Sequence, residues 1–152
     1  MLLGVISDTH GLLRPEAVQA LRGVERIIHA GDVGGPEVLA ALEAIAPVVA
    51  VRGNNDRGPW GQALPHTRTV DAGGSLIYVI HDVAELDLDP AAAGIRVVIA
   101  GHSHRPGQQE RDGVLWFNPG SAGPRRFKLP IALGRLVVER GVVRAEIVTL
   151  TV

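Results

Sequence analysis

The chain has 152 residues, of which 46% are hydrophobic and 20% are charged, and its formal net charge at pH 7 is −1. A chain of this length and balance can bury a core of its own, and we expect residues 1–152 to form a single domain. It contains no cysteine, which excludes disulfides, thiolate metal ligands and a thiol nucleophile.

Two further features bear on where the chain acts. Its apolar start reaches Asp8 too soon for a signal peptide, and no apolar run approaches the roughly 20 residues that span a bilayer. We therefore expect a cytoplasmic protein with no membrane partner. The one basic cluster, residues 125–128, does not make the charged face that drives nonspecific nucleic-acid binding, so we expect no nucleic-acid partner either.

Short runs rich in valine and isoleucine recur along the chain, and polar residues or glycine close each of them. Such runs are typical of buried strands. The predicted strands are residues 2–6, 26–29, 48–51, 76–80 and 97–100. Pro15 and Pro36 stand at helix-start positions before residues 16–21 and 37–45, where apolar residues recur at helical spacing. This alternation predicts a parallel sheet with right-handed crossovers in the first half of the chain.

The second half has a different pattern. Glycine-containing pairs at 73–74, 112–113 and 140–141 interrupt apolar segments and predict three antiparallel hairpins. Those hairpins cover residues 70–80, 109–117 and 131–150. Residues 82–94 are acidic and alanine-rich, and we expect one short helix there. Together the elements predict an α/β fold in which two sheets pack face to face with helices outside.

Each of the five predicted strands ends in a polar cluster. The clusters are Ser7-Asp8-Thr9-His10, Gly31-Asp32, Gly53-Asn54-Asn55-Asp56, His81-Asp82 and Gly101-His102-Ser103-His104. In open α/β sheets ligands bind at the carboxyl ends of the strands, so we expect the five clusters to converge on one crevice. Any one cluster alone is a weak signal, because a histidine at a strand end or an aspartate beside glycine is common without a function.

The side chains of these clusters supply imidazoles, carboxylates and an amide oxygen. This mixture suits manganese, iron or zinc better than calcium, which prefers oxygen ligands alone. Asp8 and His10 stand two residues apart, as do His102 and His104, a spacing that aims both side chains the same way from an extended segment. Asp32 has a second oxygen with which to bridge two ions.

The order of these motifs resembles that of the calcineurin-like metallophosphoesterase superfamily, and in particular its small single-domain bacterial and archaeal phosphodiesterase branch. The resemblance covers nearly the whole chain, since Asn118-Pro119-Gly120-Ser121 matches a loop near the end of these proteins. It implies the metallophosphoesterase fold, a two-sheet mixed β-sandwich flanked by helices. The fold suggested by periodicity agrees with it.

The resemblance implies two divalent metal ions, with manganese expected first and nickel, iron and zinc as alternatives. One ion is expected on Asp8, His10, Asp32 and His104. The second is expected on Asp32, Asn54, His81 and His102. Two positions depart from the family pattern: Asn55 stands where many members carry a histidine that protonates the leaving group, and Asp82 stands where relatives often carry glycine.

The expected activity is hydrolysis of a phosphodiester by a hydroxide that bridges the two metals, with Asp32, Asn54 and His81 as catalytic residues. Paired metals can activate this hydroxide and stabilise charge on the phosphoryl oxygens. The expected partner is a small phosphoester substrate, with Asn55, Arg125 and Arg126 as candidate contacts. Self-association into a homo-oligomer is also compatible with the resemblance.

Two alternatives remain open at the level of sequence. The same site would serve a phosphomonoesterase, because the residues that choose between diesters and monoesters lie on loops that the pattern does not place. The fold is also used without catalysis, in the retromer subunit that acts as a protein-binding scaffold. His29 is either a neighbour that orients a metal ligand or a buried histidine with a backbone partner, and His66 has no assigned role.

Overall fold

The computed structural model of the chain describes residues 1–152, and its framework is two five-stranded sheets. The first sheet has the strand order β10-β9-β1-β2-β3. Its strands are β1 (Leu2–Ile6), β2 (Arg26–His29), β3 (Val48–Ala50), β9 (Ala132–Glu139) and β10 (Val142–Thr149). β1, β2 and β3 run parallel, whereas β9 is antiparallel to β1 and β10. The predicted parallel half and the predicted last hairpin are therefore confirmed.

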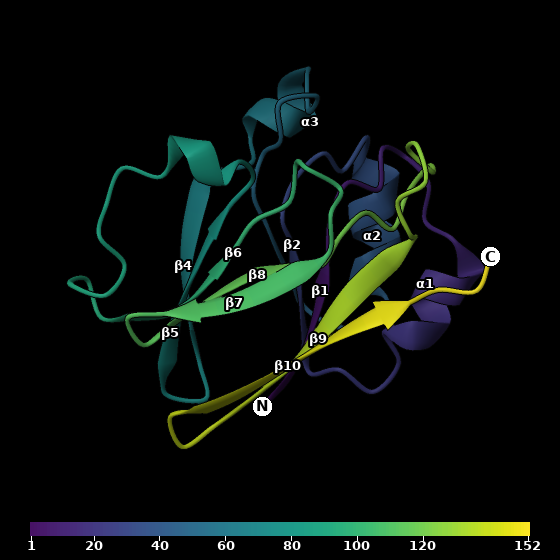
Figure 1. Cartoon of the computed structure of the whole chain (residues 1–152). Helices are drawn as coiled ribbons and strands as arrows, with labels where there is room; N and C mark the ends of the chain where they lie inside the picture. The colour runs from purple at the N-terminus through teal and green to yellow at the C-terminus, as the bar shows by residue number, and fades with distance from the viewer.

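The second sheet has the order β4-β5-β6-β8-β7 and faces the first (Figure 1). Its strands are β4 (Thr67–Ala72), β5 (Ser75–Ile80), β6 (Ile95–Ile99), β7 (Gly107–Arg111) and β8 (Val114–Asn118). β5, β6 and β8 run parallel, and β4 and β7 are antiparallel edge strands. The other two predicted hairpins are thus also confirmed, and both sheets are mixed.

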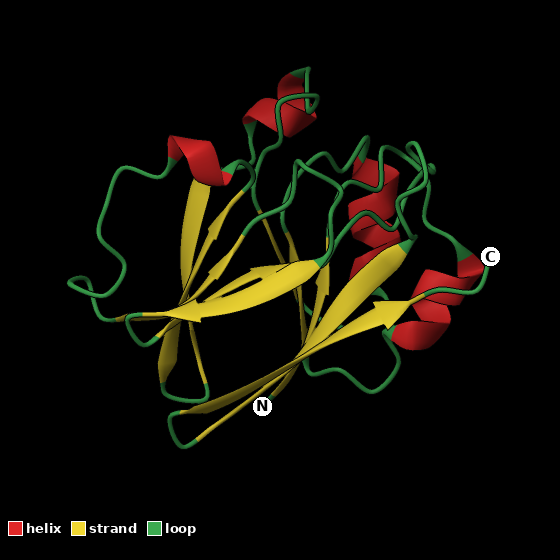
Figure 2. Cartoon of the chain, in the orientation of Figure 1, coloured by secondary structure: helices red, strands yellow, loops and turns green.

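Three helices and one 3₁₀ turn connect the strands (Figure 2). They are α1 (Pro15–Ala20), α2 (Pro36–Glu43), α3 (Pro59–Gln62) and the turn η1 (Val83–Glu85). Each helix begins with proline, whose fixed φ and missing N–H suit the first helical position. The sequence pattern did not predict α3, because four residues are too few to show a helical period. No helix of the chain is long and apolar enough to cross a membrane.

The helices cover only one of the two outer faces. Ala17 and Leu21 of the α1 region and Val38 and Leu42 of α2 pack in one apolar cluster against the outer face of the first sheet. The outer face of the second sheet is instead covered by the segment after η1, which packs Leu86 and Leu88 against strands β5 and β6. The predicted sandwich with helices outside is confirmed, with the helices on the first sheet.

The main core lies between the sheets. Fifteen buried residues form one cluster there, and nearly all are the inward-facing members of strands. They include Val5 and Ile28 of the first sheet and Val79 and Ile99 of the second. Because each of these strands is anchored by such a residue close to its carboxyl end, the loops that follow them are held in fixed positions.

Gly134 of β9 lies at a close approach between the two sheets. A Cβ atom at this position would overlap the edge of the Phe117 ring, which is buried at the end of β8. Phe117 adjoins Asn118, whose side chain bonds to the loop after β6. Because Gly134 has no side chain, the Phe117 ring of the second sheet can pack against β9. This packing holds Asn118 where it bonds to the loop after β6.

We predict that Gly134→Ala lowers the free energy of unfolding by about 1–3 kcal/mol, because an extra carbon in a packed core forces its neighbours to move. Gly107→Ala is the matched control, since Gly107 also lies in a strand and a Cβ atom there meets nothing within 4 Å. We expect the control to change stability by no more than about 0.5 kcal/mol. Urea unfolding of the three proteins measures the difference, and equal changes would show that the sheets do not meet tightly here.

Candidate metal centre

The predicted polar clusters lie together where both sheets present the carboxyl ends of parallel strands (Figure 1). β1, β2 and β3 contribute three of the clusters from the first sheet, and β5 and β6 contribute two from the second. Main-chain and side-chain bonds hold the loops to one another. The His102 N–H donates to Asp8 at 3.1 Å, and the His81 ring lies 2.7 Å from the carbonyl of Ala30. The two sheets thus meet at one crevice.

The carboxylate of Asp8 lies at the centre of this crevice and is completely buried. Its Oδ2 accepts hydrogen bonds from the Ser7 hydroxyl at 2.6 Å and from the His102 N–H at 3.1 Å. Its Oδ1 has no hydrogen-bond partner. Burial alone would raise the pKa of Asp8, but the close contact with His104, the hydrogen bond from Ser7 and the nearby His81 hold it below its usual value.

Three imidazoles point their Nε2 atoms toward the unpaired Oδ1 of Asp8. The distances are 3.3 Å to His104, 3.8 Å to His10 and 4.0 Å to His81. The Nδ1 atom of His104 is also buried without a partner. A buried acceptor with no donor is costly, because it has lost its hydration and gained nothing in return. A cation among these atoms would satisfy the carboxylate, so the donor set fits a metal ion.

Asp32 lies on the other side of the crevice and is also buried. Its Oδ1 accepts from the backbone N–H of Asn55 at 2.8 Å, and its Oδ2 accepts from the Asn55 amide at 3.1 Å. Oδ2 lies 3.7 Å from His10 Nε2 and 3.3 Å from His81 Nε2. Burial raises the pKa of Asp32, but the contacts with His81 and Asn55 outweigh it and keep the carboxyl well below its usual range.

His81 is held between carbonyl and carboxylate groups. Its Nδ1 donates to the Ala30 carbonyl, which leaves Nε2 facing Asn54 Oδ1 at 3.0 Å and Asp32. Burial lowers the pKa of His81, but the contact with Asp32 and the charge of Asp8 raise it to about 9. Without a metal ion, the ring is therefore an imidazolium near neutral pH. A carbonyl on Nδ1 is the arrangement that directs Nε2 to a metal.

Two groups of side chains bring their ligand atoms within 4.8 Å of one another. The first consists of Asp8, His10 and His104, and the second of Asp8, Asp32 and His81. Asp8 is common to both groups, whereas the sequence pattern assigned the bridge to Asp32. Asp32 Oδ2 nevertheless lies within 4 Å of an imidazole from each group. Both carboxylates therefore lie between the two groups.

His102 stands at the edge of the crevice. Its ring is half-exposed, packs edge-on against His81 with 5.2 Å between the centroids, and lies 3.7 Å from Asp82. Asp82, the second departure from the family pattern, also accepts from the Ala84 N–H at 3.0 Å and so caps η1. An aspartate at this position therefore fixes the turn that follows His81.

Backbone strain is concentrated in the crevice. Eight non-glycine residues have φ in the left-handed region, and five of them belong to the polar clusters. The five are Asp8, His10, Asp32, His102 and His104. This conformation costs an L-residue roughly 1–2 kcal/mol, and such strain gathers at functional sites where the surroundings impose it. The strained backbone conformation thus directs these side chains into the crevice.

Glycine precedes several candidate ligands because there is no room for a larger residue. A Cβ atom at Gly53 would collide with the backbone and carboxylate of Asp32, and one at Gly101 would collide with the side chains of Ser7 and Asp8. These positions admit no side chain because the strand ends approach one another closely. The pairs Gly53-Asn54 and Gly101-His102 therefore occur where loops from different strands come into close contact.

Several residues support the ligand loops without facing the crevice as ligands. Asn118 donates to the Gly101 carbonyl at 3.0 Å, and Ser121 donates to the Asp8 carbonyl at 3.0 Å. Asp56 is buried and accepts from the Gly34 N–H at 3.1 Å and the Gly53 N–H at 2.8 Å. Sequence reasoning gave Asp56 no role, because one of its partners, Gly34, comes from another loop.

His29 is buried and bonded on both ring nitrogens. The Gly31 N–H donates to Nδ1 at 3.1 Å, so Nε2 carries the proton and donates to the Thr9 hydroxyl at 3.0 Å. Burial lowers the pKa of His29 to about 4, which keeps the ring neutral. Of the two predicted alternatives, the histidine with a backbone partner is the one found, and it ties β2 to the loop after β1.

Arg125 and Arg126, the predicted phosphate contacts, lie on an exposed loop after Ser121. The Arg125 guanidinium donates to the Leu129 carbonyl at 3.2 Å, within the same loop. Gly123, at the start of this loop, packs against the backbone of Asp8 and Thr9. The base of the loop therefore belongs to the site, and contact of its arginines with a substrate stays a proposal.

A polar cleft of about 250 Å³ adjoins the crevice on the side of the second sheet. None of the nine residues that line it is hydrophobic. They are Arg52, Gly53, Asn54, Asp56, His66, His81, Asp82, Glu85 and His102. We refer to this cavity below as the polar cleft. It places Asn54 and His81 within reach of a small polar molecule.

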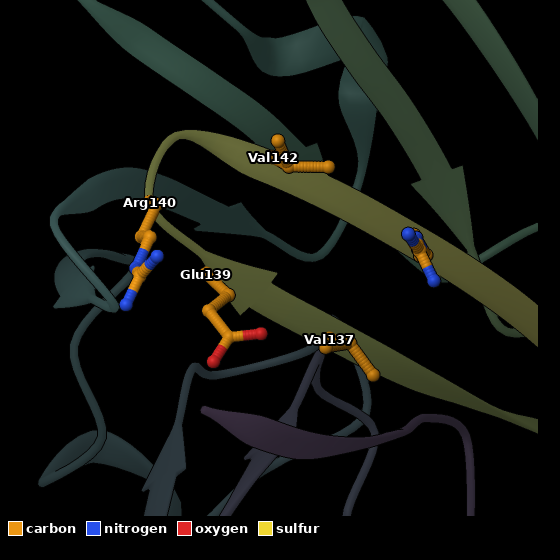
Figure 3. Close-up of a pocket in the computed structure, with 5 residues that line it drawn as sticks. Val137, Glu139, Arg140 and Val142 are labelled. Carbon is orange, nitrogen blue, oxygen red and sulfur yellow. The ribbon is translucent and has the colours of Figure 1, made fainter.

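Another hollow lies on the hairpin of β9 and β10, where Val137, Glu139, Arg140 and Val142 line it (Figure 3). Val137 pairs with Leu2 at the amino end of β1, the end opposite to Asp8. The hollow contains no imidazole and only one carboxylate. It therefore has no part in the metal centre.

Comparison with known proteins agrees with this geometry. The family model described as the calcineurin-like phosphoesterase superfamily domain matches residues 1–141. A protein of Methanothermobacter thermautotrophicus named "Probable metallophosphoesterase" is 41% identical over 142 residues, which cover 86% of this chain and 82% of that protein. A phosphodiesterase of Methanocaldococcus jannaschii is 31% identical over 79% of this chain and 83% of its own length.

Solved structures have the same fold. An archaeal phosphodiesterase superposes with a TM-score of 0.80 at 26% identity, covering 97% of this chain and all of that one. Vacuolar Protein Sorting 29 from Cryptosporidium parvum superposes with a TM-score of 0.79 at 18% identity, covering 99% of this chain and 97% of that one. These matches confirm the resemblance seen in the sequence and the mixed two-sheet sandwich. The chain belongs to the calcineurin-like phosphoesterase superfamily, a family of metal-dependent hydrolases.

Proposed function

We propose that residues 1–152 act as a phosphodiesterase with a dinuclear metal centre. One observation carries the proposal: Asp8 is fully buried, its Oδ1 has no hydrogen-bond partner, and it belongs to both groups of metal-ligating side chains. Two neighbouring groups that share a carboxylate suit a pair of ions better than a single one. A scaffold protein would gain nothing from this arrangement, which costs stability as long as no cation binds.

The proposed ligands are those that the family resemblance implied. Asp8, His10, Asp32 and His104 would hold one ion. Asp32, Asn54, His81 and His102 would hold the other. Such a pair supplies Lewis-acid stabilisation of the phosphoryl oxygens and a hydroxide nucleophile at neutral pH. We propose manganese as the native metal, since imidazole, carboxylate and amide ligands without thiolate are compatible with it.

The chain's own residues prepare the site in three ways. Ser7 and the His102 N–H hold one oxygen of Asp8 and leave the other directed at the three imidazoles. Asn55 orients Asp32 through two hydrogen bonds. The Ala30 carbonyl turns His81 so that Nε2 faces Asn54 and Asp32. These bonds fix the donor atoms before any ion or substrate arrives, which avoids reorganisation during the reaction.

Preference for diesters is supported by the relative named as a phosphodiesterase, which is 31% identical to this chain. The relation to the vacuolar sorting protein rests on 18% identity and extends to the fold alone. Phosphomonoesterase activity at the same centre is the second candidate. A direct comparison of a diester and a monoester substrate decides between the two.

We predict that the protein hydrolyses bis(p-nitrophenyl) phosphate, that chelation abolishes this activity, and that manganese restores it. We also expect kcat/KM to be higher for this diester than for p-nitrophenyl phosphate. Release of p-nitrophenolate from metal-stripped protein reloaded separately with manganese, nickel, iron, zinc and magnesium measures both. No turnover with any metal would favour a scaffold role, and faster turnover of the monoester would favour a phosphomonoesterase.

We predict that Asp32→Asn lowers kcat/KM more than Asn55→Ala does. Asp32 lies within 4 Å of His10 and His81, whereas Asn55 acts through Asp32, and its backbone bond survives the change to alanine. Loss of a group that orients a ligand typically costs 10–100-fold, so we expect about 10-fold for Asn55→Ala and more than about 100-fold for Asp32→Asn. Metal content and rate of both variants test this, and equal losses would contradict the assignment of Asp32 as a shared ligand.

We predict that metal binding near pH 7.5 releases about one proton from His81. The pKa of this ring in the metal-free protein is about 9, so a metal ion must displace a proton to reach Nε2. Apparent affinity should therefore rise about tenfold per pH unit above pH 7 and level off near pH 9. Calorimetric titration with manganese in buffers of different ionisation enthalpy counts the protons.

The control is His81→Asn, which leaves the group of Asp8, His10 and His104 intact. This variant should still bind one ion but lose most of the proton release. Equal proton release by both proteins would show that His81 does not take part in metal binding.

A further inference from the structure

The proposed function leaves one chemical task without a residue. When a phosphoester is hydrolysed, the leaving oxygen takes an electron pair from phosphorus and must be protonated unless it departs as a stable anion. Asn55 stands where many relatives carry a histidine for this task. Its amide donates to Asp32 at 3.1 Å and has no acidic proton to give. Another group must act, or the enzyme is confined to activated esters.

The polar cleft contains one imidazole that is not a proposed ligand, that of His66. His66 lies on the cleft wall with Asn54 and His81, two proposed ligands of the second ion. Arg52 also lines the cleft, but a guanidinium is too weak an acid to serve as the proton donor. Histidine is the side chain that most often serves as a general acid.

The backbone places His66 at this wall. The Arg52 N–H donates to the carbonyl of Pro65 at 2.8 Å, so the residue before His66 is bonded to the loop that carries Asn54. This bond is formed directly after β3, where the chain has left the sheet. The position of His66 relative to the ligand loop is therefore determined by main-chain pairing.

A carboxylate holds the ring from the other side. His66 Nε2 lies 3.3 Å from Glu85 Oε2, and both side chains are about half-exposed. Glu85 ends the turn η1, whose first residue follows His81 and Asp82, and the Glu85 N–H donates to the Asp82 carbonyl at 3.0 Å. The two members of the pair therefore come from the two segments that carry Asn54 and His81.

Glu85 is the carboxylate of the cleft that remains for this role. Asp56 already accepts from two backbone N–H groups, those of Gly34 and Gly53. Asp82 accepts from the Ala84 N–H at 3.0 Å and lies 3.7 Å from His102. The titratable groups that line the cleft with His66 are thus Arg52, Asp56, Asp82, Glu85 and the two proposed ligands His81 and His102.

We infer that His66 is the general acid of the reaction and that Glu85 is its positioning residue; this inference rests on the proposed phosphodiesterase function. The oxygen of a water molecule forms a bond to phosphorus, and the bond from phosphorus to the leaving oxygen breaks. The electron pair stays on the leaving oxygen, which takes a proton from the His66 imidazolium and departs as an alcohol. A proton equivalent to the one lost by the attacking water returns to His66 from solvent.

The cleft also fits the leaving group that such an acid would serve. Its walls offer donors and acceptors, three imidazole rings among them, and none of the lining residues is hydrophobic. An unsubstituted aryl group would gain little there, because apolar rings are bound by apolar walls. A small hydroxylated alcohol, which leaves as a basic alkoxide and needs a proton, matches the cleft in size and polarity.

The test compares a series of symmetric diaryl phosphates, from bis(p-nitrophenyl) phosphate to diphenyl phosphate, with the manganese-loaded protein. General acid catalysis contributes about 10²–10⁴-fold where the leaving group is basic. His66→Gln should therefore lose at least about tenfold more kcat/KM with diphenyl phosphate than with bis(p-nitrophenyl) phosphate. The plot of log kcat/KM against the pKa of the released phenol becomes steeper.

Two further readouts separate proton donation from a structural role. The fall in kcat/KM at high pH with diphenyl phosphate should disappear in His66→Gln, and added imidazole should restore rate to His66→Ala. Glu85→Gln should show a smaller loss of the same kind, because this variant keeps the His66 imidazole but holds it less firmly. Glu139→Gln is the matched control, since Glu139 is exposed on the β9–β10 hairpin away from the cleft.

The outcomes are distinct. Absence of hydrolysis of bis(p-nitrophenyl) phosphate by the unaltered protein overturns the proposed function and this inference with it. Normal hydrolysis with parallel plots for His66→Gln and the unaltered protein overturns the inference alone. An equal loss with every substrate and no rescue by imidazole would show that His66 binds substrate rather than donating a proton, which also overturns it.

Discussion

The buried carboxylate of Asp8 governs how the side chains of the candidate metal centre are arranged. One of its oxygens is satisfied by Ser7 and by a backbone N–H of the opposite sheet, and the other faces three imidazoles without a hydrogen bond. A buried charge needs compensation, and here the compensation comes from side chains on different strands. The strand ends therefore converge for two reasons: the sheet topology brings them to one edge, and the buried charge of Asp8 needs partners from several of them.

Strain and close packing follow from that convergence. Five residues of the polar clusters adopt left-handed backbone conformations, and glycine precedes several candidate ligands because there is no room for a Cβ atom. These features cost folding free energy, which the large core between the sheets offsets. The molecule is thus stabilised away from the site and strained within it. Occupation of the centre by cations would remove part of this cost.

The two sides of the crevice differ in a way that bears on chemistry. On the side of Asp8, His10 and His104 the groups are mostly buried and the donor atoms are closely gathered. On the side of Asn54, His81 and His102 the crevice opens into the polar cleft, where His66 Nε2 lies 3.3 Å from Glu85 Oε2. The open side is therefore where we propose that substrate binds, and the buried side is the more rigid part of the site.

The strands, the hairpins and the polar clusters could be predicted from the sequence, because runs of apolar residues, glycine turns and polar residues at strand ends are local patterns. Other relations appear in the folded structure alone: Asp8 is the residue common to both groups, Asn55 turns to Asp32, Asp56 links two loops, and His66 meets Glu85. Each of these relations joins segments that are distant in sequence. Their geometry depends on how the two sheets pack and on backbone strain at their edges, and no local pattern encodes either.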